Sequence, residues 1–262
     1  MIIAVSDVHL GEIGFQEQDK QFSSFLDYVQ NTLFKEGGEL VLLGDIFDFW
    51  RRDSLEIFEL YSDVIEKIKL FPSNINVHYI VGNHDYYMSE IPQYFNELPF
   101  SSFGMSITIK DVQIFRFIHG HQLEVMTNPY TKDMSLYLSL ARRLSYHAGI
   151  TGNTASGIWN VLTSLTQIEG NYLSSMLKDP LLRLNGEHRG EKRIQTLSKS
   201  KARQFILGGT FDWLVFGHTH YPFNDNESKT TNTGSWGRDR LRNELCYLKI
   251  ENGTPESMIW SP

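Results

Sequence analysis

Five short segments of the sequence concentrate residue types that bind divalent metal ions. They hold six of the nine histidines, and they are Asp7-Val8-His9, Gly44-Asp45-Ile46-Phe47-Asp48, Gly82-Asn83-His84-Asp85, His119-Gly120-His121 and Gly217-His218-Thr219-His220. Carboxylate oxygen and imidazole nitrogen, without thiolate, suit ions such as manganese, iron or zinc. Seven or more such ligands exceed the need of one ion, so we expect two ions that share a bridging carboxylate. Two ions about 3.5–4 Å apart can hold a phosphoryl group and a bridging hydroxide.

The spacing within the segments has a physical reason. In an extended chain, residues i and i+2 point to the same side, so Asp7 and His9 can reach one cation, as can His218 and His220. A glycine before a ligand allows a sharp exit from a strand and a close approach of the backbone. Three candidate ligands follow a glycine, namely Asp45, Asn83 and His218.

Predicted strands precede these segments and must position them. The hydrophobic pattern predicts a strand over Ile2–Ser6, a helix near Glu17–Lys35, a strand over Val41–Leu43, a helix capped by Asp53 and Glu56, and a strand over Val77–Val81. This order is typical of α/β proteins, in which ligands collect at the carboxyl ends of the strands.

The hydrophobic pattern changes in the second half of the chain. Alternating hydrophobicity predicts a hairpin over 105–118 and further strands over 213–216, 229–234, 245–250 and 257–260, so two sheets with outer helices are expected. Residues 127–205 contain only amphipathic helical stretches, such as 158–168. We interpret residues 1–262 as a single domain that carries residues 127–205 as a helical insertion.

Composition narrows the class of protein. The 262 residues are 41% hydrophobic and 21% charged, which is typical of a globular protein. The single cysteine, Cys246, excludes an internal disulfide framework and a zinc site built on several cysteines. A net charge of −7 argues against a general nucleic-acid coat protein. We find no signal-peptide core and no 18-residue apolar span, so we expect a cytoplasmic protein, with peripheral membrane contact as the alternative.

Taken in order, the motifs D-x-H, G-D-x-x-D, G-N-H-D, H-G-H and G-H-T-H resemble those of the calcineurin-like metallophosphoesterase superfamily. The resemblance spans residues 7–220 and implies a four-layer α/β/β/α sandwich of two mixed sheets with a dinuclear site. It implies one ion held by Asp7, His9, Asp45 and His220, and a second held by Asp45, Asn83, His119 and His218. His84 then matches the histidine of that superfamily that protonates the leaving group, and Asp85 would orient the His84 ring.

This resemblance implies a phosphoesterase or pyrophosphatase. The implied mechanism is direct attack on phosphorus by a hydroxide that two metal ions would supply, with His84 as general acid and no covalent intermediate. Manganese is the expected metal, with iron, zinc, nickel or cobalt as alternatives. A nuclease or cyclic-nucleotide phosphodiesterase of the same superfamily is the alternative function. A non-catalytic scaffold is a remote one, because the chain retains every ligand.

Within the superfamily, the GDIFDFW segment, the insertion after H-G-H and the strand-rich tail are most similar to the UDP-2,3-diacylglucosamine pyrophosphatase-like group. In that group the insertion forms a helical cap that covers acyl chains, which implies a nucleotide-linked or lipid-linked small substrate. Members acting on the lipid A precursor have arginine after the motif asparagine and end the fourth motif in H-G-D. Here those positions are His84 and His121, so a related diphosphate is expected instead.

Other side chains are candidates for supporting roles. The insertion has 11 basic and 5 acidic residues, a net charge of +6 against −13 for the remainder. These basic residues could form a cap that binds the oxygens of a diphosphate. The alternative is that they form a solvated helix face. Asp48 is expected to support the site by hydrogen bonding or to bind metal, and His121 to contact substrate, to support the ligands or to be solvated. The candidate substrate contacts are His121, Arg51, Arg142 and Arg143.

Overall fold

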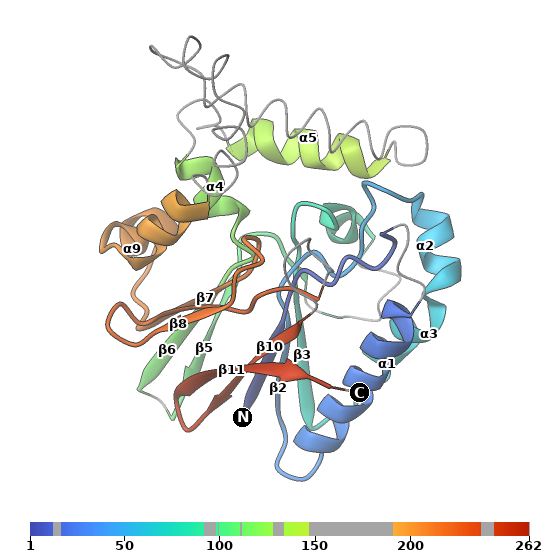
Figure 1. The fold of residues 1–262 in the computed structure, drawn as a ribbon, viewed down its shortest axis with the longest axis horizontal. Coiled ribbons are helices and arrows are strands. Elements are labelled where there is room, and N and C mark those ends of the chain that lie inside the picture. The colour runs from blue at the N-terminus through green and yellow to red at the C-terminus, as the bar shows by residue number, and fades with distance from the viewer. Residues whose placement is uncertain are drawn as a thin grey trace.

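The computed structural model describes residues 1–12, 17–91, 98, 100–110, 112–127, 134–146, 191–236 and 244–261. Their strands form a six-stranded and a five-stranded sheet that lie face to face, with helices on both outer sides (Figure 1). Both sheets are mixed, because each contains parallel and antiparallel pairs. The predicted α/β/β/α sandwich is therefore confirmed.

The six-stranded sheet is built around the N-terminal strand. In sheet order its strands are β11 (Thr254–Trp260), β10 (Leu245–Glu251), β1 (Ile2–Val5), β2 (Gly38–Leu42), β3 (Ile75–Ile80) and β4 (Phe100–Ser101). β1, β2 and β3 are parallel, whereas β10 is antiparallel to β1. The polar segments that follow β1, β2 and β3 consequently leave the sheet at the same edge.

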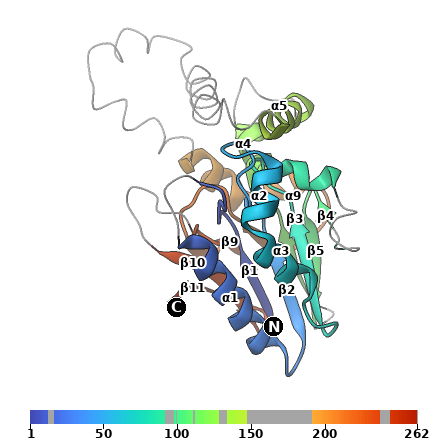
Figure 2. The same cartoon turned by 90° about the vertical axis from the view of Figure 1, so that its right-hand side faces the viewer.

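Three helices cover the outer face of this sheet: α1 (Gln18–Leu33), α2 (Ser54–Leu60) and α3 (Ser62–Lys69) (Figure 2). The predicted helix after Asp53 is two helices, because the backbone leaves helical geometry at Tyr61, where φ is −111°. Asp53 caps α2 as predicted and accepts a hydrogen bond from the backbone N–H of Leu55 at 2.9 Å. Glu56 pairs with Arg52 on the preceding turn.

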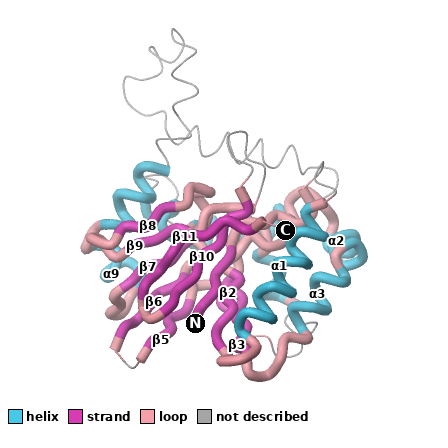
Figure 3. The backbone as a smooth tube through the Cα atoms, turned by 60° about the horizontal axis from the view of Figure 1, so that its bottom comes forward, coloured by secondary structure: helices cyan, strands magenta, loops and turns pink. Residues whose placement is uncertain are grey.

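The five-stranded sheet contains the predicted hairpin. Its strands, in sheet order, are β5 (Met105–Ile109), β6 (Gln113–Phe117), β7 (Trp213–Phe216), β9 (Thr230–Asn232) and β8 (Phe223–Asp225) (Figure 3). β6 is parallel to β7, and β7 is parallel to β9. The sequence pattern does not predict β8 or β4, because two or three residues are too few to show alternation.

β1 is buried on both faces, which explains its continuous apolar sequence. Ile3 and Val5 pack in the cluster beneath helices α1 and α3, whereas Ile2 and Ala4 pack in the cluster between the sheets. Phe115 of β6 belongs to the same inter-sheet cluster. β1 therefore forms part of two hydrophobic layers, which holds its end in place.

Further helices lie over the second sheet and over one end of the sandwich. Residues 191–199 are helical, α9 spans Ala202–Leu207, and Ile194 packs with Leu214 and Phe216 of β7. Helices α4 (His121–Thr127) and α5 (Met134–Tyr146) lie over the end at which β1, β2 and β3 finish (Figure 1). The rest of the predicted insertion, including the helix expected over 158–168, lies outside the described residues. None of the described helices is long and apolar enough to cross a membrane.

Candidate metal centre

The five predicted segments meet at one end of the sandwich, because they follow β1, β2, β3, β6 and β7. Three groups of side chains place one ligand atom each within 4.8 Å of one another. The groups are Asp7, His9 and His220; His9, Asp45 and His84; and Asp45, His119 and His218. Since His9 and Asp45 each belong to two groups, the side chains form one continuous cluster.

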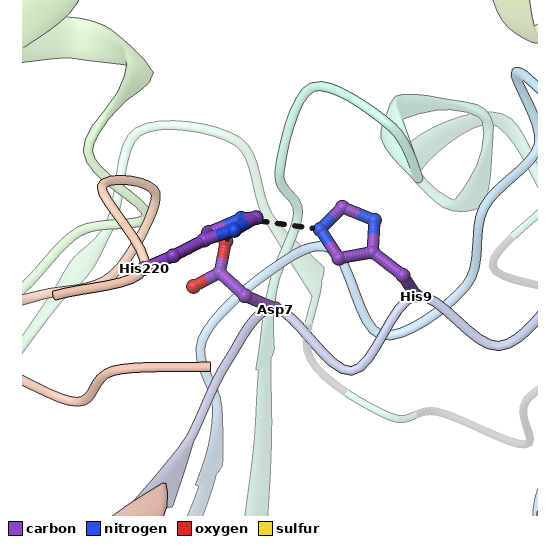
Figure 4. A group of neighbouring side chains, drawn as sticks. All are labelled: Asp7, His9 and His220. Atoms are coloured by element: carbon purple, nitrogen blue, oxygen red, sulfur yellow. Dashed lines mark hydrogen bonds and ion pairs between the residues drawn. The ribbon is translucent and has the colours of Figure 1, made fainter. Parts of the chain in front are cut away.

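Asp7, His9 and His220 form one side of the cluster (Figure 4). The Nε2 atom of His220 lies 3.3 Å from Asp7 Oδ1 and 3.4 Å from Nε2 of His9. The other oxygen of Asp7 accepts hydrogen bonds from the backbone N–H of His218 at 2.9 Å and from the Ser6 hydroxyl. These bonds leave Oδ1 as the carboxylate oxygen beside the imidazole of His220.

Asp45 lies between the two sides of the cluster. Its Oδ2 atom is 3.2 Å from His119 Nε2 and 4.0 Å from His9 Nε2. Its Oδ1 atom accepts a hydrogen bond from the backbone N–H of His84 at 2.8 Å. His119 donates through Nδ1 to the carbonyl of Leu43 at 2.8 Å, so Nε2 is the ring atom that faces Asp45 and that would offer its lone pair to a metal ion once the ring is neutral.

Four buried candidate ligand atoms make no hydrogen bond within the described structure: Asp7 Oδ1, His9 Nδ1, Asn83 Oδ1 and His119 Nε2. Three of them lie instead 3.2–3.6 Å from a side chain that can carry the opposite charge, without hydrogen-bond geometry. Buried polar atoms nearly always have partners, and leaving one without a partner costs about 1–3 kcal/mol. These atoms are carboxylate, amide and imidazole donors gathered at one place. Such a donor set fits divalent cations.

The carboxylates and histidines of the cluster shift one another's pKa values. Burial raises the pKa of Asp7, but His220 and His119 lower it more, to about 2. Asp45 is likewise buried, and His119 and His84 hold the pKa of its carboxyl well below the ordinary value. Burial lowers the pKa of His119, whereas Asp45 and Asp7 raise it to about 10. The ionised carboxylates thus create a site that favours positive charge.

Five candidate ligands have a left-handed backbone, with φ between 53° and 67°: Asp7, His9, Asp45, His218 and His220. The other non-glycine residues of the described chain with positive φ are Lys110, Lys229 and Asn252, which lie in turns between antiparallel strands. This conformation costs about 1–3 kcal/mol per residue and clusters at functional sites. The strain therefore coincides with the predicted ligands.

Two glycines provide the close approach that the sequence predicts. A Cβ atom on Gly82 would overlap Oδ1 of Asp45, and one on Gly217 would lie 2.5 Å from Oδ2 of Asp7. Neither glycine has a positive φ, so each is required for space rather than for an unusual conformation. The prediction of close backbone approach is confirmed at both positions.

His84 lies between Asp48 and Trp50. Its Nδ1 atom is 3.0 Å from Asp48 Oδ1, and its ring stacks on the Trp50 indole with centroids 4.0 Å apart. Burial lowers the pKa of His84, but Asp48 and Asp45 raise it more, so the pKa is above the ordinary value. With Nδ1 bonded to Asp48, Nε2 is the ring atom available for a further partner.

Asp85 makes different contacts from those predicted. Its buried carboxylate accepts hydrogen bonds at 2.6–2.8 Å from the backbone N–H groups of Gly82 and Ile46 and from the Tyr79 hydroxyl. Burial and the neighbouring Asp45 raise its pKa to about 6. The predicted role of orienting His84 therefore falls to Asp48, whereas Asp85 ties together the turns that carry the ligands.

Two of the predicted substrate contacts are engaged with carboxylates. Nη1 of Arg51 lies 2.6 Å from Glu12 and 3.0 Å from Asp48, so this guanidinium supports the carboxylate beside His84. Arg142 of α5 pairs with Glu90 at 2.5 Å, which joins α5 to the 3-10 helix η1 (Tyr86–Glu90). Both guanidinium groups are thus paired with carboxylates, and their contact with substrate stays a prediction.

The remaining two candidates differ in exposure. Arg143 is exposed on α5. His121 is completely buried, and both of its ring nitrogens have no hydrogen-bond partner within the described structure. Its ring stacks on Tyr137 at 5.6 Å with an interplanar angle of 7°. The expectation of a solvated His121 is therefore wrong.

The sequence analysis missed Glu124. Its Oε2 atom lies 2.9 Å from Nε2 of His218 and accepts a hydrogen bond from the Tyr137 hydroxyl at 3.1 Å. Burial raises the pKa of Glu124, but the bond to His218 lowers it more, so the group is held ionised. One signal was present in the sequence: Glu124 is the first acidic residue after the H-G-H motif, one helical turn beyond His121.

Two mixed sheets with a carboxylate and imidazole cluster at their strand ends define an α/β sandwich with a candidate metal centre. The family model of calcineurin-like phosphoesterases matches residues 1–222. The chain therefore belongs to the calcineurin-like phosphoesterase family, which is a family of metal-dependent enzymes.

One curated protein and two solved structures are similar to this chain. A UDP-2,3-diacylglucosamine hydrolase from Neisseria meningitidis is 30% identical over 87 residues, which are 33% of this chain and 34% of that protein. The matched region thus spans about a third of this curated relative. A dimetal phosphatase from Danio rerio is 10% identical, covers 99% of this chain and 98% of its own, and has a TM-score of 0.45. A predicted phosphoesterase from Streptococcus pneumoniae is 13% identical, with coverage of 99% and 97% and a TM-score of 0.37.

Proposed function

We propose that the protein hydrolyses phosphate esters or diphosphates at a dinuclear metal centre. The observation that carries this proposal is the position of Asp45, which belongs to one ligand group with His9 and to another with His119 and His218. One carboxylate thus faces two sets of ligands, which is the requirement for a bridge between two ions. Two ions, when bound, lower the pKa of a water molecule and neutralise phosphate oxygens.

The ligands divide into two sets around Asp45. Asp7, His9 and His220 would hold the first ion together with Asp45, and Asn83, His119 and His218 would hold the second. The unpartnered Oδ1 of Asn83 and Nε2 of His119 support the second set. Manganese suits this mixture of oxygen and nitrogen donors, and iron, zinc, nickel and cobalt are the alternatives that a metal assay would distinguish.

His84 would donate a proton to the leaving oxygen. Asp48 holds its Nδ1, and the stacked Trp50 fixes the plane of the ring. The raised pKa favours the protonated ring, and its side chain is 15% exposed, so a substrate atom can approach it. General acid catalysis of this kind contributes about 10²- to 10⁴-fold in rate.

The substrate we propose is a small diphosphate linked to a nucleotide or a lipid. The match to a UDP-2,3-diacylglucosamine hydrolase supports this class. The exposed Arg143 lies on α5, over the same end of the sandwich as the cluster, where it could contact phosphate oxygens (Figure 1). In this chain His84 and His121 replace residues typical of lipid A precursor hydrolases, so we expect a related substrate rather than that precursor.

Substitution of Asp45 tests the proposal. Asp45→Asn should abolish most manganese-dependent hydrolysis of bis(p-nitrophenyl) phosphate and reduce bound manganese from two ions per chain, because a bridging charge is lost. Asp27→Asn is the matched control, since Asp27 pairs with Lys67 at the surface at 2.6 Å and belongs to none of the ligand groups. Undiminished turnover in Asp45→Asn would overturn the mechanism.

A substrate panel tests the proposed class. UDP-sugars, acylated UDP-sugars, mononucleotides, cyclic nucleotides and single-stranded DNA would be compared at equal manganese concentration. The proposal expects the highest kcat/KM with an acylated or nucleotide-linked diphosphate. Preferred cleavage of single-stranded DNA, with binding that weakens steeply as salt rises, would instead identify a nuclease.

A further inference from the structure

Helix α5 is joined to the metal centre by a chain of two hydrogen bonds. The Tyr137 hydroxyl of α5 donates to Glu124 Oε2 at 3.1 Å, and the same oxygen lies 2.9 Å from Nε2 of His218. Tyr137 is 2% exposed, and Glu124 comes from α4, which lies beneath α5 (Figure 1). The bonds therefore run from a helix of the insertion, through α4, to a side chain of the Asp45, His119 and His218 group.

The contact with Glu124 decides which nitrogen of His218 carries the proton. An ionised carboxylate only accepts hydrogen bonds, so the proton of the neutral ring is on Nε2 and the lone pair is on Nδ1. A carboxylate behind a metal-binding histidine also fixes the ring orientation and makes the ligand more basic. Glu124 has the position and the charge for this role, and it belongs to none of the ligand groups itself.

Tyr137 contacts two residues of α4, because its hydroxyl bonds Glu124 and its ring packs on His121. Its ring stacks on the buried His121, whose centroid lies 5.6 Å from that of His119. A carboxylate that accepts from both His218 and Tyr137 has fewer alternative rotamers than one bonded to His218 alone. Loss of the Tyr137 hydroxyl should therefore affect the His218 ring indirectly, through Glu124.

We propose that Glu124 is a positioning residue for His218 and that Tyr137 positions Glu124, so that occupancy of the second metal site depends on α5. This inference rests on the proposed dinuclear function. It makes the insertion part of the metal-binding apparatus as well as a cover for substrate. Asp7 of the first site is bonded to the backbone N–H of His218 at 2.9 Å and not to the His218 ring, which is the group that Glu124 positions.

The test is manganese binding to metal-free protein, measured by calorimetry and by electron paramagnetic resonance. Glu124→Gln keeps the size of the side chain and removes its charge. We expect it to weaken one of the two manganese sites by about 10- to 100-fold, the usual effect of losing such a partner, and to leave the other unchanged. Tyr137→Phe should weaken the same site by a smaller factor. His119→Ala identifies that site, because it removes a ligand of the second ion only.

A double variant tests whether Tyr137 and Glu124 act through the same chain of hydrogen bonds or independently of each other. Since Tyr137 acts through Glu124, adding Tyr137→Phe to Glu124→Gln should weaken binding by less than the product of the two single effects. Tyr247→Phe is the matched control, because the Tyr247 hydroxyl bonds that of Tyr28 at 3.1 Å in another part of the fold. This control should bind both ions as the wild type does.

Three results would overturn the inference. The first is wild-type affinity at both sites in Glu124→Gln, while the wild type itself binds two ions and hydrolyses substrate; this would leave the proposed function intact. The second is an equal loss at both sites with a fall in the melting temperature of the metal-free protein, since that would indicate a merely structural role. The third is a wild type that binds fewer than two ions, which would overturn the dinuclear function as well.

Discussion

Gly82→Ala is the sharpest test of how the fold positions Asp45, the carboxylate that we propose bridges the two ions. A Cβ atom on Gly82 would overlap Asp45 Oδ1 and lie 2.6 Å from the backbone nitrogen of Asp45, whereas ordinary contact begins at 3.4 Å. The turns that carry Asp45 and Asn83 must therefore separate. A displacement near 1 Å in a catalytic group costs about 100-fold in rate. We expect a loss of kcat of that order, together with weaker manganese binding.

The stability of the same variant has a predictable sign. Alanine restricts the unfolded chain and would stabilise the protein by about 0.4–1 kcal/mol if the site could accept it. Forcing a methyl group into a packed site costs about 1–3 kcal/mol. Because the overlap at Gly82 involves backbone as well as a side chain, the second effect should dominate. For a domain of this size the melting temperature falls by about 2–4 °C per kcal/mol.

Gly208→Ala is a control that introduces backbone strain without steric overlap. Gly208 has φ of 69°, and a Cβ atom there would have nothing within 4 Å. This control should lower the melting temperature through backbone strain of about 1–3 kcal/mol and leave manganese binding and kcat unchanged. Thermal unfolding of the metal-free proteins, manganese titration and steady-state kinetics provide the comparison. A Gly82→Ala protein that is more stable than the wild type and retains its kcat would refute the reasoning.

Two further predictions concern proton transfer and pH. His84→Ala should reduce hydrolysis of a diester with an alkyl leaving group by about 10²- to 10⁴-fold and that of a nitrophenyl ester far less, since nitrophenolate departs without a proton; equal losses would contradict the general-acid role. Hydrogen bonds from His78 and Asn76 lower the pKa of Glu39, whereas burial raises it, and the pKa is lowered on balance. The ionised carboxylate therefore stabilises the fold above the unfolded-state pKa of about 4.3. This contribution disappears as the pH falls through the lower folded-state pKa. The difference in urea unfolding free energy between wild type and Glu39→Gln should therefore shrink as the pH falls from about 5 through the folded-state pKa, and a constant difference would exclude this linkage.

The sequence predicts β1, β2 and β7 well, because each contains a short apolar run that ends in polar residues. Ile2–Val5 and Trp213–Phe216 are buried at every position, so burial and residue type agree. The same logic predicts that the motif residues meet, since parallel strands of one sheet end at one edge. What the pattern cannot supply is the split of the second helix at Tyr61, which depends on local backbone geometry.

The partners of the catalytic side chains are harder to predict than the ligands. Asp48 and Asp85 are both acidic residues in a motif, and only the path of the backbone decides which of them reaches His84. Asp85 is adjacent to His84 in the sequence, yet its carboxylate points to Gly82 and Tyr79. Glu124 lies three residues beyond the H-G-H motif, on the helix that begins at His121. Its role depends on tertiary packing with Tyr137, which no local pattern encodes.

The two sides of the metal centre are supported in different ways. Beyond the strands, the backbone ladder continues into the site: the N–H of Asp7 donates to the carbonyl of Gly44 at 3.0 Å, and the N–H of His9 donates to that of Asp45 at 2.9 Å. These bonds hold the left-handed residues of the first side, whose strain persists only where the surroundings define the conformation. His218 has a backbone anchor on Asp7, but its ring depends on Glu124 and so on helices outside the sheets. The first of the two proposed sites is thus built into the sandwich, and occupancy of the second would respond to the helices that lie over it.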